Sequence, residues 1–255
     1  MSAASHEPIA QFVAKWHRRE PEMAQAEVFC APALRPRFRA WGALVHELRE
    51  ASFELSDPRV AQVKGQWWAE ELAGLSAGRG RHPVTSPLAG IAADWTGLAQ
   101  ALLDAALDDG RPGDAGQAIA RLLPLSAALA RVESAVFDAK QLPEDARAVA
   151  VHLLLQRLPD GLVAEDQALL PMNLLARHGL TAAQVAAGQG EPLLRDWAGE
   201  LLAALPAPRH PVLYRRLRTG FDRARLARLA AGRGFDPPGP FATLLRAWRL
   251  ARAAA

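Results

Sequence analysis

Two adjacent amphipathic helices are predicted over residues 38–75, and this pair constrains the fold more than any other part of the chain. In the first helix, expected over about residues 36–55, apolar side chains recur at three- and four-residue spacing. Asp57 is then suited to cap a second helix whose first turn holds Pro58. On the second helix, the apolar residues expected to form one buried stripe are Val60, Val63, Trp67, Leu72 and Leu75. The pair favours a fold built from packed helices.

The rest of the chain also has helical spacing. A short helix is expected to start at Pro21, since proline suits a first turn. Ser86 and Pro87 are expected to cap and open another helix, and a break is expected at Pro159-Asp160-Gly161. Further helices are predicted at about residues 88–107, 114–139, 144–157, 165–177, 181–187, 191–204, 211–231 and 240–252. Alternating strand patterns are essentially absent, so the sequence predicts an all-α fold, with one domain over residues 1–255 because no long flexible linker is present.

Composition excludes several classes of protein. Half of the 255 residues are apolar, so a buried core is expected and disorder is not. A formal net charge of +3 provides no general affinity for nucleic acid. No segment approaches the roughly 20 apolar residues needed to cross a bilayer, so any membrane contact would be peripheral. The single cysteine, Cys30, rules out an internal disulfide, fits a reducing cytoplasm and is expected to be a small buried residue.

The C-terminal part of the chain, residues 209–255, is markedly basic. In its first helix an apolar stripe is expected from Leu217, Phe221, Leu226 and Leu229, with arginines in the remaining positions. We expect these arginines to form a solvated basic face, and the alternative is a patch for anionic membrane lipid or for the phosphates of a prenyl diphosphate. The arginines of this part are Arg209, Arg215, Arg216, Arg218, Arg223, Arg225, Arg228, Arg233, Arg246, Arg249 and Arg252.

Other signals for catalysis are weak. The serines lack a nucleophile-elbow sequence, and Gly78-Arg79-Gly80 is a turn rather than a phosphate-binding loop. No two of the scattered histidines have the helical spacing of zinc ligands, so surface or helix-cap roles are expected for them. These histidines are His17, His82, His152, His178 and His210.

Three segments of the chain resemble, in their order and spacing, segments of squalene/phytoene synthase-family proteins. They are AEVFCAPALRPRFRAWGALVHELREASF, DPRVAQVKGQWWAEELAGLSAGRGRHPVT and LLPMNLLARHGLT. Within them an aromatic pair, Trp67-Trp68, is followed by an acidic pair, Glu70-Glu71, and a proline-led segment follows at residues 171–179. The resemblance spans roughly residues 26–181 and fades in the basic C-terminal part.

This resemblance implies an all-helical isoprenoid-synthase-like bundle with a central cavity. Active members of the family condense two prenyl diphosphates head to head, with Mg²⁺ held between two aspartate-rich motifs that face each other across the cavity. Mg²⁺ prefers hard oxygen ligands, which carboxylates three or four residues apart on a helix can supply together. Adjacent helix positions diverge by about 100°, so two neighbouring tryptophans cannot both face the core. By the same resemblance, the substrate or cavity residues would be Trp67, Trp68, Glu71 and Lys64.

The chain departs from the family at both motif positions. Where the first motif belongs there is no aspartate, and the candidate magnesium ligands are Glu47, Glu50 and Glu54, at positions i, i+3 and i+7. These glutamates share a helix face, although a solvated acidic face fits their spacing equally well. Where the second motif belongs, at residues 152–160, Leu, Gln and Arg replace the expected aspartates, and Asp160 lies beside a predicted turn.

Two functions therefore stay open. In the first, the chain is a divergent, catalytically degenerate relative that keeps its cavity for an isoprenoid or lipid-like ligand, or for an assembly role. Family members that resemble a respiratory complex I assembly factor also lack complete aspartate motifs. In the second, the chain is an active prenyl transferase of the phytoene or squalene synthase type, with Mg²⁺ as its cofactor and a prenyl diphosphate as its substrate. The missing second acidic cluster favours the first function.

Overall fold

Helices make up all the regular structure in the described part of the chain. The computed structural model describes residues 8–253 except residues 56, 109 and 163–167. Its helices are α1 (Ala10–Arg19), α2 (Pro21–Ala26), α3 (Arg35–Phe53), α4 (Pro58–Ser76), α5 (Trp95–Ala106), α6 (Ala115–Val136), α7 (Asp145–Gly161), α8 (Met172–His178), α9 (Ala182–Gln184), α10 (Glu191–Ala204), α11 (Leu213–Ala230) and α12 (Pro240–Arg252). Single 3-10 turns occur at Glu27–Phe29, Pro32–Leu34 and Ser86–Leu88, and a π-helical turn occurs at Val185–Gln189. Over these residues the all-α prediction is confirmed.

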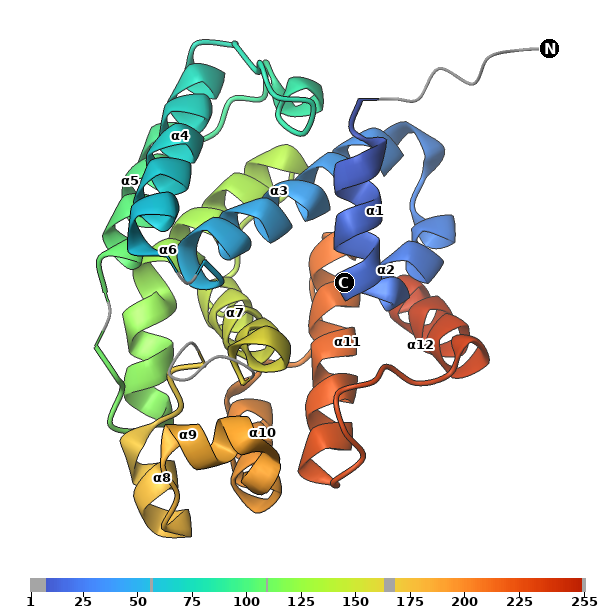
Figure 1. Ribbon diagram of the computed structural model, residues 1–255. Coiled ribbons are helices and arrows are strands. Elements are labelled where there is room, and N and C mark those ends of the chain that lie inside the picture. Colours follow the sequence, from blue (N-terminus) through green and yellow to red (C-terminus); the bar gives the residue numbers. More distant parts are fainter. Residues whose placement is uncertain (1–7, 56, 109, 163–167, 254–255) are drawn as a thin grey trace, which may run out of the picture.

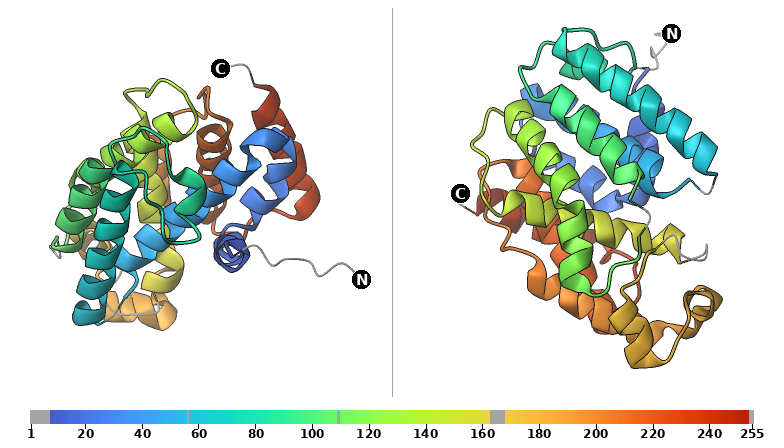
Figure 2. Two further views of the ribbon diagram at one scale, coloured as in Figure 1. Left: turned by 90° about the horizontal axis from the view of Figure 1, so that it is seen from above. Right: turned by 90° about the vertical axis from the view of Figure 1, so that its left-hand side faces the viewer.

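The long helix α3 crosses the molecule between two groups of helices (Figure 1). Helices α4, α5 and α6 pack in sequence on one side of it, and α1, α2, α11 and α12 lie on the other (Figures 1 and 2). Helix α7 lies between the groups and contacts α6, α10 and α11. Helix α2 packs on both α11 and α12, so the N-terminal and C-terminal parts of the described chain share one side of the molecule.

Aspartate caps determine where several helices begin. Asp57 accepts a hydrogen bond from Arg59 N at 2.8 Å, which starts α4 at the position that the sequence predicts. The helix expected from residue 88 starts instead at Trp95, because Asp94 caps it by accepting from Gly97 N at 2.9 Å. The prediction that Ser86 caps this helix is wrong, since residues 86–88 form only a single 3-10 turn.

Helix α7 ends at Gly161, within the break predicted at Pro159-Asp160-Gly161 but later than the helix end predicted at residue 157. Proline lacks the backbone N–H that would donate one intrahelical hydrogen bond. Pro159 lies in the last turn of α7, where few further backbone hydrogen bonds can be disrupted. The turn is closed beyond it by Leu162 N, which donates to Leu158 O at 3.0 Å. The helix predicted over residues 165–177 starts at Met172 in the structure, and residues 163–167 of that prediction lie outside the described residues.

Helix α4 buries a different face from the one that its sequence suggests. Val60, Val63 and Trp67 were expected to be buried, yet they are 51%, 71% and 44% exposed. Leu72 and Leu75 are buried as expected, and Trp68 is buried beside them on the face toward α5. The two sets lie on neighbouring faces, about 100° apart around the helix, and the predicted stripe mixed members of both. The exposed Trp67 and buried Trp68 agree with the prediction that two adjacent tryptophans cannot both face the core.

Two other burial predictions are confirmed. Cys30 is a free, buried thiol. The apolar stripe predicted on α11 is buried, and consists of Leu217, Phe221, Leu226 and Leu229. Among the helices that are described, none has both the length and the apolar character required to cross a membrane.

Candidate functional site

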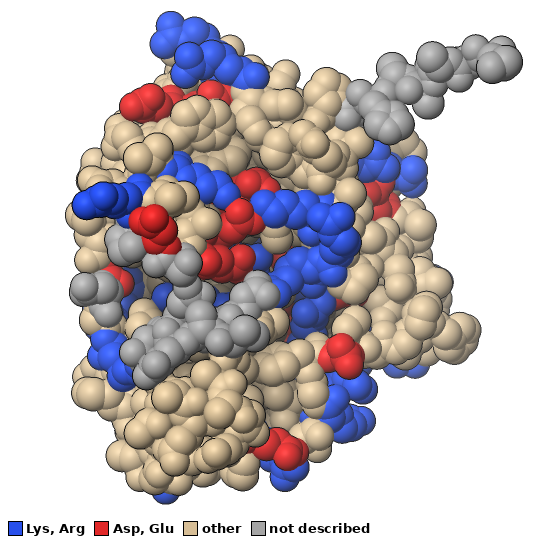
Figure 3. Space-filling model, in the orientation of Figure 1, with Lys and Arg blue, Asp and Glu red and all other residues tan. Residues whose placement is uncertain are grey.

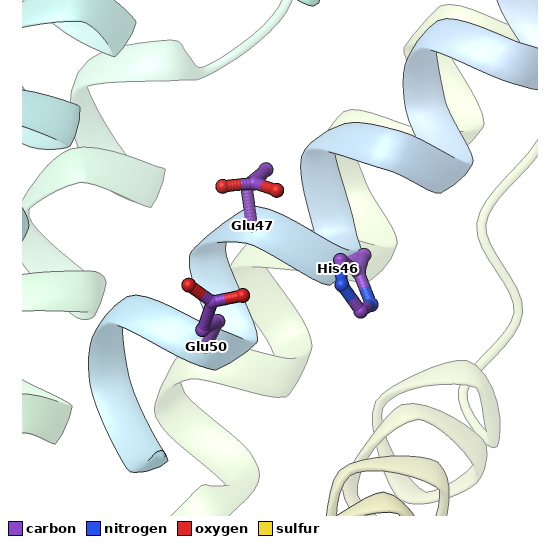
Figure 4. A group of neighbouring side chains, drawn as sticks. All are labelled: His46, Glu47 and Glu50. Atoms are coloured by element: carbon purple, nitrogen blue, oxygen red, sulfur yellow. The ribbon is translucent and has the colours of Figure 1, made fainter. Parts of the chain in front are cut away.

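Three side chains of α3 form a group of potential metal ligands. His46, Glu47 and Glu50 each have one ligand atom within 4.8 Å of the others (Figure 4). Glu47 and Glu50 are two of the three carboxylates that the sequence nominated. The third, Glu54, is not part of this group; its carboxylate lies 3.1 Å from Arg49 and 3.9 Å from Arg19.

Two lysines bind the carboxylates of this group. Lys15 of α1 donates to Glu47 Oε1 at 2.8 Å and also contacts Glu50. Lys64 of α4 donates to Glu50 Oε1 at 2.5 Å and lies 3.9 Å from Glu47 Oε2. We call these four residues, Lys15, Glu47, Glu50 and Lys64, the lysine-carboxylate cluster. Each negative charge on α3 is therefore matched by an ammonium group from a neighbouring helix.

The lysines also determine the protonation of the cluster. Burial opposes ionisation of Glu50, but the hydrogen bonds from Lys15 and Lys64 outweigh it and lower the pKa of Glu50 to about 2. In turn, burial lowers the pKa of Lys15, but bonds to Glu47 and Glu50 outweigh this and raise it. Glu50 and Lys15 are thus both charged at neutral pH. Figure 3 shows charged side chains of both signs gathered at the centre of this face of the molecule.

Helix α7, which the second metal motif would occupy, presents an amide to α3. Gln156 is fully buried, and its side-chain oxygen lies 3.3 Å from Arg49 Nη1 of α3. Arg19 at the end of α1 donates to the same amide oxygen at 3.2 Å and to Gln156 O at 2.5 Å. Gln156 thus presents a side-chain amide and a backbone carbonyl to these arginines. A magnesium clamp would need carboxylates at this place.

The site does not fit a magnesium clamp. Its third ligand is an imidazole: burial and then the nearby Arg49 lower the pKa of His46 to about 4, so the ring is neutral at pH 7. His46 Nε2 is buried without a hydrogen-bond partner, and Nδ1 lies 3.1 Å from Arg49 Nη2. Mg²⁺ prefers oxygen to nitrogen ligands, and here the two carboxylates already carry ammonium partners.

The remaining predicted cavity residues form a separate group around the loop after α4. Glu71 is buried and accepts hydrogen bonds from Arg81 N at 2.7 Å, His82 N at 2.9 Å and Thr85 Oγ1 at 2.5 Å. The rings of Trp67 and Trp68 lie 5.4 Å and 5.1 Å from the ring of His82, both edge to face. Of the four predicted cavity residues, Lys64 belongs to the lysine-carboxylate cluster, whereas Glu71 organises a loop. Their shared role in substrate binding stays a prediction.

Sequence reasoning missed a network of buried charges on α11. Arg218 lies 3.0 Å from Glu22, 3.1 Å from Asp222 and in contact with Glu20, and all four side chains are buried. Arg225 lies 2.7 Å from Glu22. We call these five residues the buried ion network. The expected solvated basic face is therefore wrong for α11, because the acidic residues around α2 neutralise its arginines inside the protein.

The same helix makes a second buried pair. Arg215 holds Glu133 of α6 in a bidentate contact, at 2.8 Å and 2.6 Å, and Glu133 also accepts from Trp41 Nε1 of α3 at 2.8 Å. One carboxylate thus joins three helices. In the sequence, charged residues at positions 215, 218, 222 and 225 follow a helical face, which is the one signal that could have indicated burial.

Two histidines are buried, contrary to the surface roles expected for them. His152 of α7 lies 3.1 Å from Asp222 and 3.7 Å from Glu20, so it extends the buried ion network. His210 lies 3.2 Å from Asp145 and accepts from Val212 N at 2.9 Å, directly before α11. The surface role fits neither residue, and α11 starts without a side-chain cap.

The chain matches no protein-family model and no curated protein sequence. Among solved structures, it is similar to the crystal structure of squalene synthase HpnC from Alicyclobacillus acidocaldarius. That similarity has a TM-score of 0.49 and a sequence identity of 16%, and it covers 97% of each chain.

Proposed function

We propose that this chain is a catalytically degenerate squalene/phytoene synthase-like protein, which binds an isoprenoid or lipid-like molecule or serves in assembly without magnesium-dependent chemistry. The observation that carries this proposal is the lysine-carboxylate cluster. The motif order around Trp67-Trp68 and Glu70-Glu71 supports the family resemblance. The pairing of Glu47 and Glu50 with Lys15 and Lys64 supports the loss of the metal chemistry.

Ionising a prenyl diphosphate requires the charge of the leaving group to be neutralised as it forms. In the proposed protein the carboxylates that would hold Mg²⁺ have charged partners of their own, and the facing position on α7 is Gln156. Displacing two ammonium groups to admit a metal ion would cost the charge-assisted hydrogen bonds of the cluster. These features support ligand binding more than they support bond cleavage.

A second candidate function has one observation in its favour. The ligand atoms of His46, Glu47 and Glu50 converge within 4.8 Å, and His46 Nε2 has no hydrogen-bond partner. If the lysines swing aside, a divalent ion that accepts nitrogen, such as Mn²⁺, has three donors in reach. This alternative is an active prenyl transferase with an altered metal site.

One experiment separates the two functions. The purified protein is incubated with farnesyl or geranylgeranyl diphosphate and with Mg²⁺ or Mn²⁺, and diphosphate release and hydrocarbon products are measured. We expect no release, together with a rise in Tm caused by the prenyl diphosphate that does not depend on the metal. Release of diphosphate with formation of a hydrocarbon from two prenyl chains would overturn the proposal. Farnesol serves as the matched ligand without a diphosphate.

A further inference from the structure

Helix α12 has an unusual distribution of side chains between its two faces. The inward face, which packs against α2 and α11, buries the small residues Thr243 and Ala247. Leu250 completes this face over Gly220 of α11, where a side chain would collide with it. The large apolar residues point the other way. Those on the exposed face are Phe241, Leu244, Leu245 and Trp248, at 81%, 39%, 37% and 43% exposure.

These four residues form one continuous apolar stripe. They occupy positions i, i+3, i+4 and i+7, which together span an arc of about 100° around the helix. A surface helix normally turns such a stripe toward the core and its polar residues outward. In α12 the apolar stripe faces away from the protein. An exposed stripe of this kind is suited to contact with a binding partner or a membrane.

The charges of α12 are all positive. Arg246, Arg249 and Arg252 are exposed, and residues 240–252 contain no aspartate or glutamate. The guanidinium of Arg252 lies 5.0 Å from the centre of the Trp248 ring, at one end of the apolar stripe. On α11, by contrast, Arg215 and Arg218 are buried against carboxylates. The arginines of α12 therefore remain available to an external anion.

We infer that α12 lies along the surface of an anionic phospholipid bilayer. Phe241, Leu244, Leu245 and Trp248 enter the boundary between headgroups and acyl chains, and the arginines bind lipid phosphates. A helix with aromatic and aliphatic residues on one face and arginines beside them has the composition of an interfacial helix. This inference does not rest on the proposed function, since none of its residues belongs to the lysine-carboxylate cluster.

The exposed face of α12 is less suited to a second copy of the chain than to an anionic lipid surface. A two-fold dimer formed through the stripe would bring α12 against α12, because such an interface joins identical surfaces. Three arginines from each copy would then approach one another with no carboxylate on either helix to separate them. An anionic lipid surface supplies the complementary charge to Arg249 and Arg252, which lie within about 90° of the centre of the stripe.

The test is co-sedimentation of the full chain with phosphatidylcholine vesicles and with vesicles that also contain phosphatidylglycerol. We expect binding to the anionic vesicles that weakens as salt is added, and little binding to the neutral ones. Replacing Arg249 and Arg252 by Gln should weaken binding on the order of tenfold, and replacing Phe241 and Trp248 by Ser should weaken it by a similar factor.

The matched control is Val63→Ser, which removes an exposed apolar residue from α4 and should leave vesicle binding unchanged. Failure of the parent protein to bind anionic vesicles would overturn the inference. So would equal binding by the α12 variants with their helical content and Tm unchanged. Association of the parent protein into dimers that the Phe241/Trp248 variant abolishes, without vesicle binding, would assign the face to a second copy and also overturn it.

Discussion

Helices α11 and α12 follow each other in the sequence and are both rich in arginine, yet they use that charge in opposite ways. In α11, Arg215, Arg218 and Arg225 are buried and paired with acidic residues from α2, α6 and α11 itself. In α12 the arginines are exposed, and the helix has no acidic residue. The difference follows from the position of each helix in the fold. Helix α11 contacts α2, α7, α10 and α12, whereas α12 lies at an edge of the molecule (Figure 2). Arginine content alone does not decide where a basic surface lies.

The largest expected difference in stability is between two single variants, one that lacks an arginine of α11 and one that lacks an arginine of α12. Arg218→Met leaves Glu20, Glu22 and Asp222 buried with fewer cations, and breaking a buried pair costs about 3–5 kcal/mol. Arg246→Met on α12 is the matched control, and exposed substitutions change stability by about 0.5 kcal/mol or less. The free energies of unfolding are measured in urea. Similar values for the two variants would contradict the difference between the helices.

The pH dependence of stability sharpens the comparison. Burial opposes ionisation of Glu20 and Asp222, but Arg218 and then His152 outweigh it and lower both pKa values to about 2. Because these folded-state values lie below the unfolded ones, near 4.5 and 3.8, the stabilisation is present above those values and is lost as the pH falls toward 2. Each group contributes on the order of 2–3 kcal/mol by this linkage.

Denaturation followed between pH 6 and about pH 2 measures this loss. In the Arg218→Met variant the free energy of unfolding should depend less steeply on pH, because the cation that depresses both pKa values is gone. The Arg246→Met variant should follow the parent. A parent protein whose stability is flat over this range would rule out the ionised form of the network.

The lysine-carboxylate cluster is an intermediate case, with half-buried cations on one buried carboxylate, Glu47, and one half-buried carboxylate, Glu50. Lys15→Met together with Lys64→Met should destabilise the protein by about 1–3 kcal/mol, because two charge-assisted bonds are lost. The same double variant should acquire a rise in Tm with added Mg²⁺ or Mn²⁺, while the parent shows none. Lys140→Met, at an exposed lysine away from the cluster, is the control. A metal-dependent rise in the parent would contradict this account of the cluster.

The smallest effect is expected at the apolar face of α12. Phe241→Ser should change the free energy of unfolding by no more than about 0.5 kcal/mol, since the side chain is 81% exposed. Leu217→Ala on α11 is the buried counterpart and should cost about 2–5 kcal/mol. Urea denaturation compares the two. A large loss from Phe241→Ser would mean that this residue packs within the protein.

Much of the helical framework was predictable because its signals are local. The ends of α10 and α12 were predicted within a residue, since Pro192 and Pro240 lie in their first turns. The start of α5 was predicted too early, because an alanine-rich run continues the helical spacing whether or not a cap interrupts it. The acidic face of α3 was predicted from spacing, and two of its three carboxylates share a site.

Partners distant in sequence were beyond prediction. Residues 20 and 218 lie far apart along the chain, and nothing in either segment specifies their contact. Lys15 and Lys64 reach Glu50 from two different helices, so the neutralisation of the acidic face depends on how α1, α3 and α4 pack. The buried face of α4 was predicted wrongly for the same reason. The helix has two apolar faces, and packing against α5 determines which of them is buried.

The sequence by itself determined the helical class, most helix ends and the scarcity of carboxylates at residues 152–160, because spacing, caps and composition act within a few residues. Tertiary structure alone decided which arginines are buried, which lysines bind the carboxylates of α3 and which face of α12 stays exposed. The physical reason is that a charge is stable in the interior only beside an opposite charge, and that partner is supplied by packing.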